Sequence, residues 1–126
     1  MMSSLRCAVW VCILGHCLWA CFPGTAFGQW YKGGTLHAAN GLEWQQATES
    51  NRLATAADLV AAVAKGGDTK IPSHTVEDFR PYAEQLAACI TEATQTKVGA
   101  MVPVQDLAEL CVVSMQRIFP RTRVTY

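Results

Sequence analysis

The feature that most constrains this chain is a stretch near its start that carries no charged side chain. Residues 7–28 contain no Asp, Glu, Lys or Arg, and Arg6 is the only charged side chain before them. The apolar run 7–22 is 16 residues long. A membrane-spanning helix needs about 20 residues, whereas the apolar region of an export signal needs about 7–15. The sequence therefore predicts that residues 1–28 direct export and do not belong to the folded domain.

The end of this stretch has the features of a peptidase site. Pro23 interrupts a helix, and Ala26 and Gly28 place small residues at positions −3 and −1. We expect cleavage between Gly28 and Gln29, which leaves a mature chain of 98 residues. The protein is then periplasmic or secreted, with no membrane attachment after processing.

Two alternatives keep the chain at a membrane. The apolar run could remain as an uncleaved anchor. Alternatively, Leu18-Trp19-Ala20-Cys21 resembles the acylation motif of bacterial lipoproteins, in which Cys21 would carry the lipid. Leu18 and Ala20 suit this motif, whereas Trp19 stands where a small residue is usual.

Removal of the export segment reduces the number of cysteines that can form disulfides. Four of the six lie within it, and only Cys89 and Cys111 remain. An even pair in an exported chain predicts one disulfide bond. The bond would close a loop of about 22 residues, which is worth about 3 kcal/mol in the chain-entropy model.

Helical periodicity dominates the mature chain, and no strand alternation is long enough to indicate a sheet. We therefore predict an all-α fold, a small bundle of three or four helices. Asn40 and Glu43 form a capping box for the first helix, which continues to Ala64. This helix is either continuous or broken near Ser50-Asn51, which decides between three helices and four.

Two further helices carry the remaining cysteines. One follows Thr75, with a kink or fresh start at Pro81, and the other runs from Pro103 to a stop at Pro120. Their apolar stripes are Val76, Phe79, Tyr82, Leu86, Cys89, Ile90 and Ala93, and Val104, Leu107, Leu110, Cys111, Met115 and Ile118. Because both cysteines lie on stripes at similar distances from the loop 94–101, the disulfide should join the last two helices. The predicted organisation is a signal peptide, an extended arm, a helical domain and a C-terminal tail, at 1–28, 29–39, 40–119 and 120–126.

Few residues could carry chemistry. A metal could use only His37, His74, Cys89 and Cys111, and these lack the close ligand pairs of structural zinc sites. The disulfide also removes the thiol that a Cys89–His74 nucleophile would need. No Gly-x-Ser-x-Gly or phosphate-binding loop occurs. The sequence predicts no metal, no cofactor and no catalytic residue.

The predicted arm contains the most suggestive cluster of side chains. Trp30, Tyr31 and His37 lie close to two glycines and are a candidate binding surface. The alternative is that the two aromatic residues fold back and cover the end of the bundle.

The net charge of the chain limits which kinds of partner are expected. The formal net charge is zero, and without Arg6 the mature chain has nine basic and ten acidic residues. No broad field therefore favours nucleic acid or an anionic membrane. We predict a small exported, non-enzymatic protein that binds another protein, as a chaperone, inhibitor or accessory subunit. The alternatives are a small exported enzyme with an unrecognised site, or a lipoprotein anchored through Cys21.

Overall fold

The computed structural model describes residues 29–66, 71–72 and 74–115. These residues form four α-helices and two 3-10 helices and contain no β-strand, which confirms the all-α prediction for this part of the chain. The elements are α2 (Gly41–Gln46), α3 (Glu49–Lys65), η2 (Val76–Phe79), α4 (Arg80–Ala93), η3 (Gly99–Met101) and α5 (Val104–Ser114).

Several sequence predictions lie outside the described residues. They are the signal peptide 1–28, the cleavage-site residue Gly28, the alternative lipid site Cys21 and the tail 120–126. None of the helices in the described part is both long and apolar enough to cross a membrane.

The first predicted helix is broken, two residues earlier than expected. The Asn40–Glu43 capping box is present, with both side chain–backbone hydrogen bonds formed. However, α2 ends at Gln46, and the hydroxyl of Thr48 accepts a hydrogen bond from the backbone N–H of Asn51. Thr48 therefore caps a new helix, because it satisfies a donor that the first turn of a helix leaves free.

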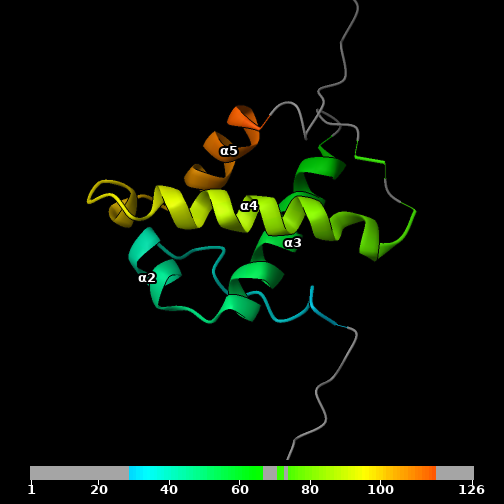
Figure 1. The fold of residues 1–126 in the computed structure, drawn as a ribbon, viewed down its shortest axis with the longest axis horizontal. Helices are drawn as coiled ribbons and strands as arrows, with labels where there is room; N and C mark the ends of the chain where they lie inside the picture. The colour runs from blue at the N-terminus through cyan, green and yellow to red at the C-terminus, as the bar shows by residue number, and fades with distance from the viewer. Residues whose placement is uncertain (1–28, 67–70, 73, 116–126) are drawn as a thin grey trace, which may run out of the picture.

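The other helices begin where proline predicts. α4 starts at Arg80 with Pro81 in its first turn, after a short 3-10 turn that follows Thr75. α5 starts directly after Pro103. Figure 1 shows α4 crossing in front of α3, with α5 above and α2 below. The core fills the space between these helices.

Two expectations for the last helix are wrong. Leu110 was expected on the buried stripe, but its side chain is 67% exposed, and Ala108 is buried instead. The face toward α4 is set by Val104, Ala108 and Cys111, and Leu110 projects from another side of the helix. The helix also ends at Ser114, earlier than the stop predicted at Pro120, and the Ser114 hydroxyl donates to the Cys111 carbonyl.

Trp44 occupies the centre of the core. Its side chain is fully buried, and its indole N–H donates to the Thr91 hydroxyl of α4 at 3.0 Å. The other large side chains that are fully buried are Leu86, Ile90, Val60, Val104, Thr55 and Thr94. A short helix of six residues is thus held in place mainly by one tryptophan.

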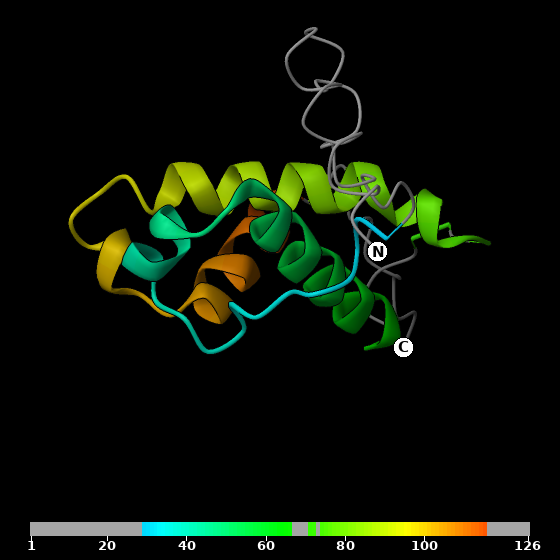
Figure 2. The ribbon, with the colours of Figure 1, turned by 90° about the horizontal axis from the view of Figure 1, so that it is seen from below.

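Two glycines allow α2 to pack against the turn after α4. A Cβ atom at Gly41 would collide with the carbonyl oxygen of Gly99, and one at Gly99 would collide with the Ala93 carbonyl. The backbone of Asn40 also pairs with that of Pro103 in an isolated bridge. Figure 2 shows α2 and η3 side by side at one end of the molecule.

Candidate binding surfaces

The structure brings together the two cysteines of the mature chain. Cys89 on α4 and Cys111 on α5 lie at disulfide-bonding distance, with their Cα atoms 6.0 Å apart. The bond joins the last two α-helices, as the sequence spacing predicts. With both sulfurs paired, neither is available to the Cys89–His74 nucleophile considered above.

The predicted arm is extended and lies along α3. The backbone N–H of Thr35 donates to Asn51 Oδ1 at 2.9 Å, and Asn51 Nδ2 donates back to the Thr35 hydroxyl at 2.9 Å. One helical turn later, the Thr55 hydroxyl accepts from the N–H of Leu36 at 3.3 Å. Polar side chains spaced four apart on a helix share one face. That face of α3 therefore satisfies the backbone of the arm.

Glycines let the arm approach α3 closely. A Cβ atom at Gly34 would lie 2.6 Å from the backbone nitrogen of Thr55, closer than real contacts allow. Gly33 has φ of +87°, a conformation that side-chain-bearing residues rarely adopt. The two glycines of the cluster thus have a conformational role.

The three residues proposed for binding all make contacts within the molecule. Trp30 donates from its indole N–H to Glu77 Oε1 at 3.0 Å, and the Arg80 guanidinium lies 5.6 Å from its ring centre. Tyr31 meets Trp30 edge-on at 5.7 Å. Both aromatic rings are half-buried against the core. His37 Nε2 lies 3.0 Å from Asp58 Oδ2 on α3. These contacts attach the arm to the bundle, and a binding role for the three residues remains a prediction.

Trp30→Ala is expected to lower the free energy of unfolding by about 2 kcal/mol, less than the loss of a fully buried tryptophan. The reason is the loss of packing on the core, of the Glu77 hydrogen bond and of the Arg80 contact. Urea unfolding followed by circular dichroism measures the change.

Trp30→Phe is the matched control. It keeps an aromatic ring but lacks the indole donor, so it should lose less stability than alanine. If Trp30→Ala is as stable as the wild type, the aromatic residues are not part of the packed structure, and their role as an external binding surface is favoured.

His37 and His74, the two histidines of the described residues, each make a different local contact. Within the described ranges, no three His, Cys, Asp or Glu side chains are placed to hold a metal ion. Near His74, it is the backbone N–H that bonds to Asp78 Oδ2, at 2.7 Å, together with the N–H of Thr75 at 2.8 Å. These two backbone donors lower the pKa of Asp78 below its usual value. The carboxylate therefore acts as the cap of η2.

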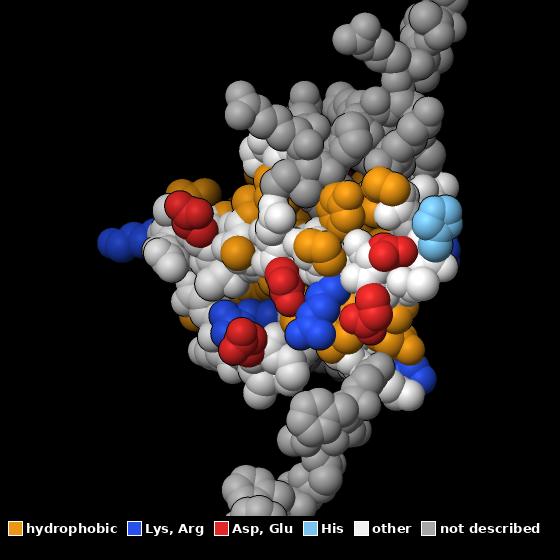
Figure 3. Space-filling view, turned by 45° about the vertical axis from the view of Figure 1, so that its right-hand side comes forward, with side chains coloured by type: hydrophobic (Ala, Val, Ile, Leu, Met, Phe, Trp, Pro, Cys, Tyr) orange, Lys and Arg blue, Asp and Glu red, His pale blue; other side chains and the backbone are white. Residues whose placement is uncertain are grey.

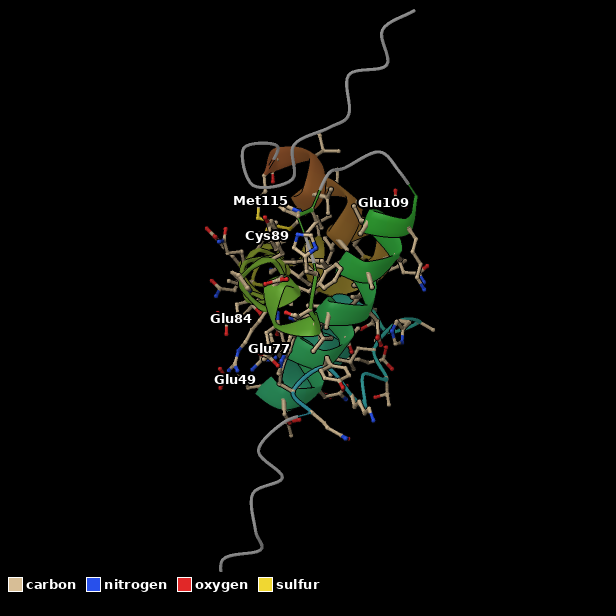
Figure 4. All side chains as sticks on the ribbon, turned by 90° about the vertical axis from the view of Figure 1, so that its right-hand side faces the viewer. Glu49, Glu77, Glu84, Cys89, Glu109 and Met115 are labelled. Carbon is tan, nitrogen blue, oxygen red and sulfur yellow. A yellow bond between two sulfur atoms is a disulfide. The ribbon has the colours of Figure 1, made fainter. Side chains whose placement is uncertain are left out.

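A groove of about 520 Å³ lies between α3 and α4. Its apolar part is formed by Leu53, Ala87 and Ala88, and its remaining lining residues are Glu49, Arg52, Arg80, Glu84, Thr91, Glu92 and Gln95. Figure 4 shows Glu49 and Glu84 on one side of the molecule and Glu109 on another. Figure 3 shows acidic and basic side chains interspersed, without a large area of either sign.

The two arginines of the groove differ in their partners. Arg80 Nε forms an ion pair with Glu84 Oε1 at 3.0 Å, one turn along α4. Arg52 is half-buried, and none of the carboxylates in the described part of the chain lies within ion-pair distance of its guanidinium. Its five donors are therefore open to an external acceptor.

Sequence reasoning did not find this groove. Its lining residues on α4 recur at helical spacing from Arg80 to Glu92, a pattern visible in the sequence. That pattern is also typical of any solvated helix face. The groove exists only because α3 crosses this face, and the crossing depends on long-range packing.

Comparison with known proteins adds no relative: no protein-family model matches the chain, and no curated protein or solved structure is significantly similar to it.

Proposed function

We propose that this is an exported, non-enzymatic protein that binds a segment of another protein in the groove between α3 and α4. Export is supported by the charge-free stretch 7–28 and its small-residue end at Gly28. The observation that carries the binding proposal is that Arg52, a half-buried residue of the groove, has an unpaired guanidinium and lies beside apolar lining residues. Arginine next to apolar surface is common at the energetic centre of protein interfaces.

The groove suits an amphipathic helix better than a small ligand. Its residues on α4 run from Arg80 to Glu92, which corresponds to about 18 Å of helix at 1.5 Å per residue. The small side chains of Ala87 and Ala88 let a second backbone approach. One face of a helix could cover the length of this groove.

The charges of the groove define the partner further. Arg80 and Glu84 neutralise each other, which leaves Arg52 between Glu49 and Glu92. A partner helix should place a carboxylate against Arg52, because guanidinium and carboxylate form paired hydrogen bonds. Its flanking cationic side chains would face the two glutamates. The apolar face of the same helix would rest on the floor of the groove.

The test is site-specific crosslinking in the compartment to which the protein is exported. A photoreactive amino acid at Ala88, which is exposed in the groove, should crosslink to one protein that mass spectrometry then identifies. Arg52→Glu should reduce this crosslink at least tenfold, because it places a third carboxylate beside Glu49 and Glu92.

Lys65→Glu is the matched control. It makes the same change of charge on the same helix, at an exposed position outside the groove. Its crosslinking should equal that of the wild type. When the partner's acidic residue is known, its replacement by lysine should restore binding to Arg52→Glu. Equal crosslinking by the Arg52 and Lys65 variants would refute the groove as the binding site.

A further inference from the structure

The first part of the arm is attached to the start of α4. The Trp30 indole N–H donates to Glu77 Oε1 at 3.0 Å, and the Arg80 guanidinium lies 5.6 Å from the centre of the ring. Glu77 belongs to η2, which continues directly into α4 at Arg80. Figure 4 shows Glu77 on the same side of the molecule as Glu49 and Glu84, two residues of the groove. The arm therefore contacts the helix that forms one wall of the groove.

The second part of the arm is attached to α3, the other wall. The backbone N–H groups of Thr35 and Leu36 donate to the side chains of Asn51 and Thr55 at 2.9 and 3.3 Å, respectively. The side chain of Leu36 is also buried in the core. Asn51 directly precedes Arg52, the unpaired cation of the groove. The same turn of α3 therefore holds the arm and carries the arginine on which the binding proposal rests.

Arg80 takes part in both the arm contact and the groove. Its guanidinium faces the ring of Trp30, its Nε pairs with Glu84 at 3.0 Å, and it is one of the residues that line the groove. None of the lining residues belongs to the arm itself. The docked arm therefore contacts a wall of the groove without occupying the space in which a partner would bind.

From these contacts we infer that docking of the arm and binding of a partner in the groove favour each other. This inference rests on the proposed function and assigns a positioning role to residues 30–36. While the arm is docked, this short segment joins the start of α4 to α3, so the two walls can separate only if a contact of the arm breaks. A partner that fits the groove in its present shape binds the docked form preferentially. Such coupling is reciprocal, so the bound partner also stabilises the docked arm.

Gly34→Ala tests the inference without altering any residue of the groove. A Cβ atom at Gly34 would lie 2.6 Å from the backbone nitrogen of Thr55, so alanine displaces the arm from α3. Photocrosslinking from position 88 should then fall at least about fivefold, the lower end of typical coupling between two sites. Gly66→Ala is the matched control, because it makes the same substitution just after α3, where the nearest atom to an added Cβ is 3.5 Å away. Its crosslinking should equal that of the wild type.

Asn51→Ala is a second variant that releases the arm without a steric clash. It removes both hydrogen bonds to Thr35 and places a strong helix former in α3, so the bundle should remain folded. Crosslinking from position 88 should fall in this variant too. Circular dichroism at the crosslinking temperature shows that each variant is folded, and if Gly34→Ala unfolds, Asn51→Ala decides the question.

The reciprocal effect gives a readout that a purely structural role of the arm would not produce. In the complex crosslinked through position 88, the amide hydrogens of Thr35 and Leu36 should exchange more slowly than in the free protein, as measured by mass spectrometry. Unchanged exchange, or a folded arm variant that crosslinks as strongly as the wild type, would overturn the coupling and leave the groove as the binding site. A wild type that does not crosslink from position 88 would overturn both proposals.

Discussion

Trp44→Ala is expected to lower the free energy of unfolding by about 3–5 kcal/mol, the largest effect of any single substitution considered. Trp44 is fully buried, and it is the large side chain with which the six-residue helix α2 enters the core. Alanine would leave a large cavity and would remove the hydrogen bond to Thr91. The free energy of unfolding of a small domain is about 5–15 kcal/mol, so the variant should be close to unfolding at 37 °C. Urea titration followed by circular dichroism measures the loss.

Trp44→Phe separates packing from hydrogen bonding. Phenylalanine fills much of the cavity but has no donor for the Thr91 hydroxyl, which keeps its own bond to the Ala87 carbonyl. Trp44→Phe should therefore lower the free energy of unfolding clearly less than Trp44→Ala does. If Trp44→Ala costs less than about 1 kcal/mol, α2 is not anchored through this side chain, and the arrangement of the core described above is incorrect.

Removal of the disulfide should have the second largest effect, a loss of about 2–5 kcal/mol. The bond joins α4 and α5 across 22 residues of sequence, and α5 has only 11 residues with which to hold its position. Cys89→Ala with Cys111→Ala removes both sulfurs, so neither a free thiol nor a wrong pairing complicates the result. Thermal unfolding of the oxidised protein and of the double variant gives the difference.

A reducing agent provides the internal control for this prediction. It should lower the thermal unfolding midpoint of the wild type toward that of the double alanine variant, and it should leave the midpoint of the variant unchanged. A wild type that is insensitive to reduction, with two free thiols found by alkylation and mass spectrometry, would contradict the bond.

Local sequence signals predicted the helix starts well. The Asn40–Glu43 capping box and Pro103 act within one turn of the chain, so their effect does not depend on the rest of the fold. Thr48 has the same kind of role, but the Ala-rich run after it is so strongly helical that the predicted break fell at Ser50-Asn51. The cysteine pair was also accessible, because only two cysteines follow the export segment.

The candidate surfaces were much less accessible to sequence reasoning. Arg52 lies near the start of α3, and nothing in the local sequence marks it as the unpaired cation of a groove. Val98 and Met101 flank a glycine in what the sequence presents only as a loop. The turn that carries them packs against α2 through the close approach of Gly41 to Gly99, residues that lie 58 positions apart.

The sequence by itself determined the helical class, the capped starts of the helices and the Cys89–Cys111 pair. Each of these depends on hydrogen bonds and periodicity within a few residues, or on counting. Only the tertiary structure decided that the arm lies along α3, that Leu110 faces outward, and that α3 and α4 form a groove. These features depend on which helix faces meet, and that choice is made by the packing of distant side chains around Trp44.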